Sequence, residues 1–401
     1  MKKCFKNTLK LGMLIALLGS LALSGCGTED AGSSNSNPGS SGQNASGQGT
    51  PGNSSASGSN PDKEAAVKSL DEYFEYTLVE GENTVLLTKY IGQAAQVTVY
   101  GSYKIGGKEY KTRLQDGVVD NTKASPFRNN TTVTSISFVD GVRLDNCSHF
   151  FSYCTNLETV DLSGLDTGSC SDFSFMFGEC HSLQAVDLSS FNTDKLDTFY
   201  NMFSGCRSLT ELDLSMLDTS RVESFYGLFS DCRSLEKVNL KGVNTASSTA
   251  FDTMFDACHS LTSVDVSGFD TSRANGMSAM FRNCSSLTGL DCSSFNTSNI
   301  VTMQDMFKGC SGLTTLNISS FDTGKVERMG SMFQSCSSLE QVDISHFTAG
   351  SLKYIDGIFK QCEKLTKAYV NQSFYDRAHS DKMKNNQDMF KDSALTDFTV
   401  K

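Results

Sequence analysis

Cysteine is the residue whose spacing in this 401-residue chain is best suited to chemistry. A thiol can form a disulfide, ligate a metal ion or act as a nucleophile, and each use requires a second group that converges on the sulfur. Nine of the 14 cysteines follow one another at intervals of 26 residues: Cys154, Cys180, Cys206, Cys232, Cys258, Cys284, Cys310, Cys336 and Cys362. The residues around them decide which use is open.

The surroundings of these cysteines favour packing. A Phe stands three residues before each of the nine and a Leu three residues after. Three further cysteines, Cys147, Cys170 and Cys292, occupy positions where other repeats carry Phe, Leu or Val. Cysteine in such a setting behaves as a small buried hydrophobe, so we expect packed free thiols. Disulfides remain an alternative because an exported protein permits them, with Cys147–Cys170 in adjacent repeats as the best pair.

Neither a metal site nor an active site is predicted. The chain has no C-x-x-C motif, and single cysteines one repeat apart lack the converging ligands that zinc requires. The histidines fall at scattered repeat positions without a Ser or Cys partner in a recognisable motif: His149, His181, His259, His346 and His379. We therefore expect a protein that is not an enzyme and that holds no cofactor.

The fixed period predicts a solenoid, because one such unit cannot bury its apolar face alone. In the unit that starts at Cys206, Leu209, Leu212 and Leu214 give the pattern L-x-x-L-x-L of a short strand. An Asp-Thr or Asn-Thr pair follows as a turn and helix cap, and then apolar residues at helical spacing, Val222, Phe225, Leu228 and Phe229. The prediction is an α/β solenoid of about ten strand-turn-helix coils that form one parallel sheet over residues 127–370.

The repeat resembles the leucine-rich repeat, and more closely the BspA-like bacterial surface proteins and the mycoplasma-type surface lipoprotein repeats. The match is carried by Met306-Phe307-Lys308-Gly309-Cys310 and its continuation to Asp322-Thr323. This resemblance implies adhesion or protein–protein interaction with host matrix, host cells or other bacteria. It also implies a protein or glycan ligand on a host or bacterial surface. A non-adhesive scaffold of the bacterial envelope is the alternative.

The two ends of the solenoid are expected to be capped, since a bare end would expose core. Residues 62–126 predict a cap with a short helix from Asp62 to Tyr76 and β-rich alternation from Tyr76 to Leu114. Residues 371–401 predict a C-terminal cap. In it, a polar insertion precedes a last coil without cysteine.

The beginning of the chain reads as an export signal. Residues 1–25 combine four lysines with an apolar stretch from Leu11 to Leu23, which is too short to span a bilayer. Leu23-Ser24-Gly25-Cys26 resembles a bacterial lipobox, which implies lipidation of Cys26 and a place on the extracellular face of the cell membrane. Residues 26–61 are a Ser/Gly/Asn-rich tether. The net charge of −11 argues against nucleic acid as a partner.

One column of side chains is the best candidate for a ligand-binding site. The residue between the two inward-facing strand positions points outward. It is asparagine in two coils, at Asn239 and Asn317. In six others it is acidic: Asp161, Asp187, Asp213, Asp265, Asp291 and Asp343. Carboxylates about 4.8 Å apart repel by about 0.8 kcal/mol per pair even in water. This repulsion must be offset by hydrogen bonds from serine, by raised pKa values of the carboxyl groups or by a bound cation. The column is thus either a structural Asp–Ser ladder or a face for a basic partner or divalent cation.

Overall fold

The computed structural model describes residues 70–116 and 124–401. Every described residue belongs to one compact unit, Ser59–Lys401. Several expected features therefore lie outside the described residues: the signal (1–25), Cys26, the tether (26–61) and the start of the cap helix at Asp62.

The first described segment is mostly β-structure. Its elements are α3 (Leu70–Tyr73), β1 (Phe74–Leu78), β2 (Thr84–Tyr90), β3 (Gln96–Tyr100), β4 (Ser102–Ile105) and β5 (Lys108–Leu114). The expected helix ends at Tyr73 instead of Tyr76, because β1 starts at Phe74 and pairs antiparallel with β2. Buried and exposed side chains alternate along β2, as the sequence pattern predicts.

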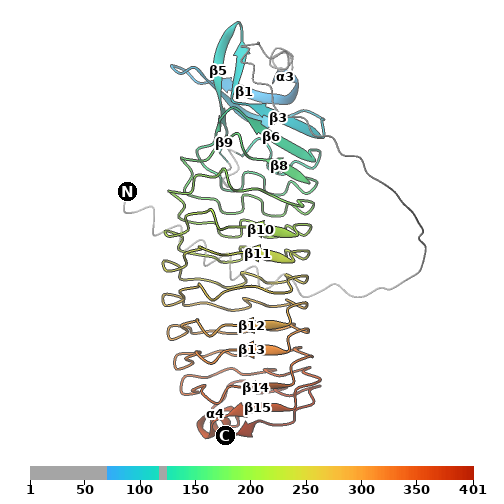
Figure 1. Cartoon of the computed structure of the whole chain (residues 1–401), viewed down its shortest axis with the longest axis vertical. Coiled ribbons are helices and arrows are strands. Elements are labelled where there is room, and N and C mark those ends of the chain that lie inside the picture. The colour runs from blue at the N-terminus through green and yellow to red at the C-terminus, as the bar shows by residue number, and fades with distance from the viewer. Residues whose placement is uncertain (1–69, 117–123) are drawn as a thin grey trace, which may run out of the picture. The chain divides into compact units, whose positions relative to one another are not determined.

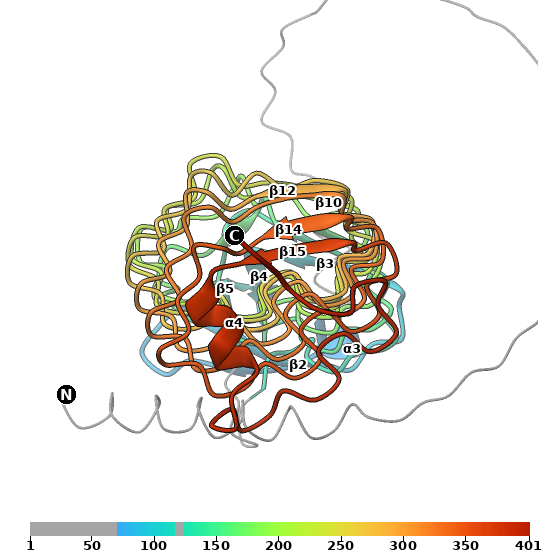
Figure 2. The same cartoon turned by 90° about the horizontal axis from the view of Figure 1, so that it is seen from below.

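The rest of the chain is a β-solenoid of about 12 turns, rather than the ten expected. Its coils stack as level layers with their strands on one side (Figure 1, Figure 2). Parallel pairing sets Leu212 of β10 opposite Val238 of β11, one repeat later. The strands are β6 (Ser135–Val139), β7 (Val142–Arg143), β8 (Thr159–Asp161), β9 (Leu165–Asp166), β10 (Glu211–Asp213), β11 (Lys237–Asn239), β12 (Gly289–Asp291), β13 (Thr315–Asn317), β14 (Gln341–Asp343), β15 (Lys367–Val370) and β16 (Thr399–Val400).

The prediction of one continuous parallel sheet is wrong. Among the described residues, the strands of the solenoid pair as β3-β6-β8, β10-β11, β12-β13 and β14-β15-β16, while β7 and β9 extend the sheet of β1, β2, β5 and β4. No strand is assigned over residues 184–188 or 262–266. Most strands are only three residues long, so a small local displacement is enough to interrupt the hydrogen-bond ladder between two coils.

The prediction of a helix in every coil is also wrong. In the coil around Phe177, every second N–H donates to a carbonyl of the next coil, at 2.7–2.9 Å, from Phe173, Phe175, Phe177 and Glu179. Of the N–H groups between them, those of Met176 and Gly178 bond back three residues within the coil, and that of Ser174 donates to the Asp172 carboxylate. Left-handed backbone at Phe175 (φ 55°) and Glu179 (φ 61°) permits this alternation. The pattern repeats down the stack.

Coil spacing explains why the helices are absent. A helix with its side chains is about 10 Å across, whereas paired strands lie about 4.8 Å apart. Helices stacked on one side would spread the coils, but turns that hydrogen-bond to the next coil keep both sides at strand spacing. Within residues 124–401 the one helix is α4 (Gln372–Ala378), which Asn371 caps by accepting from the Phe374 N–H at 2.8 Å.

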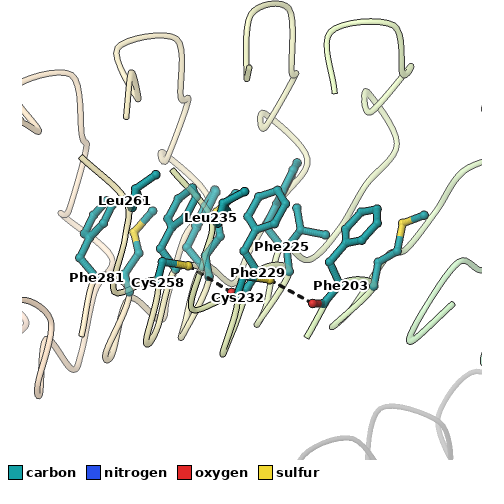
Figure 3. Packing of buried hydrophobic residues seen from close by; sticks show 14 of the residues in the cluster. Phe203, Phe225, Phe229, Cys232, Leu235, Cys258, Leu261 and Phe281 are labelled. Atoms are coloured by element: carbon teal, nitrogen blue, oxygen red, sulfur yellow. Dashed lines mark hydrogen bonds between the residues drawn. The ribbon is translucent and has the colours of Figure 1, made fainter. Parts of the chain in front are cut away.

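Ladders of identical side chains fill the core. Phe255 stacks between Phe229 and Phe281, with ring centroids 5.4 and 5.5 Å away. The thiols form a parallel row in which Cys232 donates to the Phe203 carbonyl at 3.1 Å and Cys258 to the Phe229 carbonyl at 3.2 Å (Figure 3). The recurring cysteine is therefore a small core residue that also satisfies a carbonyl group.

The Asp-Thr and Asn-Thr pairs form turns, as predicted, but they do not cap helices. Asp218 accepts the Ser220 N–H at 3.0 Å, which is a local Asx turn. The buried Thr219 hydroxyl donates to the Asn244 carbonyl at 3.0 Å and accepts the Asn244 N–H at 2.7 Å. The same pair of hydrogen bonds to the next coil is made by Thr167, Thr245, Thr271 and Thr323.

Candidate binding surface

The predicted column of acidic side chains lies on the strand side, and its members are exposed. Each carboxylate accepts the backbone N–H of the serine two residues later, at 2.7–3.0 Å. These carboxylates are Asp161, Asp187, Asp213, Asp265, Asp291 and Asp343. The Asp–Ser hydrogen bonds proposed from the sequence are therefore present. They close a turn at the end of each strand and hold every carboxylate in the same orientation.

These hydrogen bonds keep the column ionised. Bonds from the side chain and backbone of the following serine lower the pKa of Asp161, Asp187, Asp213, Asp265 and Asp291. The pKa values are thus lowered, not raised, and like-charge repulsion is offset by hydrogen bonding. Asn239 relieves it further, because its amide donates to the Asp213 carboxylate at 3.0 Å.

Asp343 gives the column a pH-dependent contact. Burial raises the pKa of this carboxyl, but hydrogen bonds from Lys401 and Ser345 lower it to about 2. A carboxyl with a depressed pKa in the folded state contributes stability at neutral pH that is lost as pH falls from about 4 towards 2. We expect Asp343→Asn to lose less stability over that interval than the wild type, measured by urea unfolding. Lys401→Met should flatten the profile in the same way, and parallel profiles for all three proteins would contradict this assignment.

Sequence reasoning missed a second outward-facing column on the same strands. In β10 to β15 it consists of the first residue of each strand, two positions before the acidic column or its equivalent: Glu211, Lys237, Gly289, Thr315, Gln341 and Lys367. The alternation of each three-residue strand was enough to find it, since positions i and i+2 share a face. The two columns together make the exposed strand face, which carries both charges and neutral polar groups.

Two adjoining hollows interrupt this face, and sequence reasoning missed them as well. The strand hollow, about 700 Å³, is lined by residues of 185–187, 211–213, 237–239 and 263–265. The turn hollow, also about 700 Å³, is lined by 238–245 and by residues between 265 and 270. Val238, Asn239 and Asp265 line both. The turn hollow lies at Gly242 and Gly268, which have no side chain to fill it, so no positive motif marks it.

The described cysteines offer no reactive group at this surface. All twelve are free and buried. Burial raises the pKa of the Cys154, Cys310 and Cys362 thiols to about 12 and that of Cys258 well above its usual value. The two off-ladder thiols in adjacent coils, Cys147 and Cys170, are likewise unbridged. A thiol held neutral in this way is a poor nucleophile and a poor metal ligand.

Thiol labelling tests this directly. We expect the twelve cysteines to resist N-ethylmaleimide in the native chain at pH 8 and to react fully in guanidinium chloride, with mass spectrometry of peptides as the readout. Met216→Cys places a thiol at a position that is 71% exposed and should react at once. Labelling of native Cys258 as fast as this added thiol would show that the core packing is wrong.

In the parts of the chain that the structure describes, no three His, Cys, Asp or Glu side chains lie close enough together to hold a metal ion. In the same residues, no helix has the length and apolar character needed to cross a membrane.

The strand pattern and its parallel stacking define a solenoid of the leucine-rich-repeat type. The chain belongs to the family described as Mycoplasma protein of unknown function, DUF285, whose model matches residues 122–237, 210–290 and 275–398. This match confirms the resemblance to the mycoplasma-type surface repeats. No curated protein matches the chain.

Several solved structures share similarity with the chain. A leucine-rich cell surface protein from Faecalibacterium prausnitzii A2-165 has 17% identity and a TM-score of 0.39, over 82% of this chain and 94% of that one. A leucine-rich-repeat protein from Bacteroides ovatus ATCC 8483 has 17% identity and a TM-score of 0.33, over 79% and 98%. The T. pallidum leucine-rich-repeat protein has 18% identity and a TM-score of 0.29, over 67% and 88%.

Proposed function

We propose that this chain is a bacterial cell-surface protein whose exposed strand face binds proteins of host matrix, host cells or other bacteria. The observation that carries the proposal is the ordered face itself. Hydrogen bonds from serine fix an ionised carboxylate at the same position in six coils, next to a second outward column. A rigid array of this kind offers many weak contacts at once, which add up when a partner spans several coils.

The proposed role is binding and not catalysis. Charged groups arranged in rows give orientation and fast association to a partner of opposite charge. A catalytic centre would instead need a nucleophile, base and oxyanion donors that converge on one point. The two hollows and the acidic column belong to the same face, so the interaction surface we propose covers the strands from β8 to β15.

The anchor is part of the proposal. The lipobox-like sequence before Cys26 supports attachment of the chain to the outer face of the cell membrane through acyl groups. Two or three acyl chains hold a protein on a membrane stably. We expect Cys26→Ala to move the protein from the membrane fraction to the medium and to abolish incorporation of radiolabelled palmitate. Retention of label by the variant would refute lipidation at this residue.

A binding panel tests the proposed function. The purified full chain is titrated by surface plasmon resonance against fibronectin, laminin and collagen, and fluorescently labelled chain is added to intact mammalian and bacterial cells. We expect saturable binding at micromolar concentration or below on at least one of these surfaces. The absence of saturable binding on every matrix protein and every cell type would contradict an adhesive role.

A further inference from the structure

The turn hollow lies where one column of the repeat changes its residues. In four coils a serine or histidine follows the strand and bonds back to the previous coil, as when Ser190 donates to the Leu162 carbonyl at 3.1 Å and Ser294 to the Val266 carbonyl at 3.3 Å. The three coils between them carry Met216, Gly242 and Gly268 in this position. No side chain of the two glycines fills the space, and the hollow opens there.

The walls of the turn hollow are partly apolar. The neighbouring ladder of stacked rings runs Phe269, Phe295, Phe321 and Phe347 at 6.4 Å intervals. It does not continue through the two preceding coils, where Leu217 and Val243 stand in the phenylalanine position. Val238, Leu240, Val243 and Phe269 line the hollow. The Met216 side chain, 71% exposed, extends the apolar surface by one coil.

The rim of both hollows is acidic. Five carboxylates line them, Asp187, Glu211, Asp213, Asp265 and Asp270, against two lysines, Lys237 and Lys241. In residues 70–116 and 124–401, none of these five forms an ion pair with a Lys or Arg. The lining therefore keeps a net negative charge, in contrast to Asp343, which Lys401 neutralises.

We propose that the two hollows bind an extended, basic segment of a partner protein. An apolar side chain of this segment enters the turn hollow above Gly242 and Gly268, and lysine or arginine side chains on either side of it pair with Asp213 and Asp265. The apolar anchor supplies affinity from a desolvated pocket, and the charges supply orientation and association rate. This proposal rests on the proposed function and specifies the kind of partner for coils 185–270.

Gly268 is the position at which the hollow can be filled without disturbing the fold. A Cβ there meets no atom within 4 Å, and the backbone is not left-handed. Gly350 has the same two properties in a coil far along the stack. Gly268→Gln and Gly350→Gln therefore add the same side chain at two unobstructed glycines, of which only Gly268 lines the hollow. For charge, Asp213→Asn with Asp265→Asn keeps the turns, because asparagine already forms the same turn at Asn239. The matched control is Asp166→Asn with Asp322→Asn, two exposed carboxylates outside both columns, whose turn asparagine forms at Asn296.

The probes are three fluorescein-labelled decapeptides that alternate Lys with Leu, Lys with Ser, or Glu with Leu, measured by fluorescence anisotropy against the full chain. We expect the Lys–Leu peptide to bind at least tenfold more tightly than the other two. Gly268→Gln should weaken it at least tenfold and the Asp213/Asp265 variant several-fold with a flatter salt dependence. Both matched controls should bind like the wild type.

Several outcomes would overturn the proposal: no binding of the Lys–Leu peptide, equal binding of the Glu–Leu peptide, or unchanged binding by Gly268→Gln. The matrix and cell panel separates this result from the wider function. If Gly268→Gln still binds a panel surface as the wild type does, the strand face functions without the hollows. If the wild type binds no panel surface, the proposed function itself fails.

Discussion

Phe255→Ala should lower the free energy of unfolding by about 3–5 kcal/mol, the range for deletion of a buried aromatic ring. Phe255 is fully buried and stacks with a phenylalanine in the coil on each side. Its loss removes apolar burial and leaves a cavity shared by three coils. Because each coil contacts only its neighbours, amide hydrogen exchange should accelerate first in the three coils around Phe255.

Urea unfolding and hydrogen exchange by mass spectrometry measure this effect. Val301→Ala is the control, because Val301 is 44% exposed and its truncation should change stability by less than about 0.5 kcal/mol. Equal stability losses for Phe255→Ala and Val301→Ala would mean that the phenylalanine ladder does not form the core.

Thr245→Val should cost about 2–4 kcal/mol although it preserves the shape of the side chain. The Thr245 hydroxyl donates to the Asp270 carbonyl at 3.0 Å and accepts the Asp270 N–H at 2.8 Å. Thr245 is 1% exposed, so valine takes away the partner of two backbone groups and offers no polar atom in its place. A lost hydrogen bond costs most when the remaining donor or acceptor stays buried.

Thr245→Ser separates the hydroxyl from the methyl group. Serine keeps both hydrogen bonds and removes one methyl, so we expect a loss of only about 1 kcal/mol by urea unfolding. If Thr245→Ser proves as destabilising as Thr245→Val, packing and not hydrogen bonding between coils explains the recurring threonine.

The stacking of the coils and the inward-facing residues could be predicted from the sequence, because a 26-residue period repeated nine times leaves no other way to bury Phe and Leu. The turn at each Asp-Thr pair and the Asp–Ser hydrogen bonds also followed from local side-chain chemistry. These features depend on residues within one repeat or on the period itself, and both are visible in a single sequence.

The helices were predicted wrongly because their signal is ambiguous. Val222, Phe225 and Phe229 are three or four residues apart, a spacing that a helix and a chain of three-residue turns both produce. What decides between them is the width available to each coil, and that depends on hydrogen bonds between coils. The turn hollow was missed for a related reason. Gly242, Gly268 and Val243 carry small side chains or none. Whether such a residue leaves a hollow depends on the side chains packed around it, and these are known only from the structure.

The most direct test of the proposed function compares the strand face with the opposite side of the coils. Thr315→Arg with Gln341→Arg places two bulky charges on the strand face. Val301→Arg with Gln304→Arg places two on exposed residues of the opposite side of the coils, called here the turn side. Each double variant is measured against the matrix proteins and cells that bind the wild type. We predict at least a tenfold loss for the strand-face variant and unchanged binding for the turn-side variant. Full binding by the strand-face variant, with loss in the turn-side variant, would show that the chain binds through its other side.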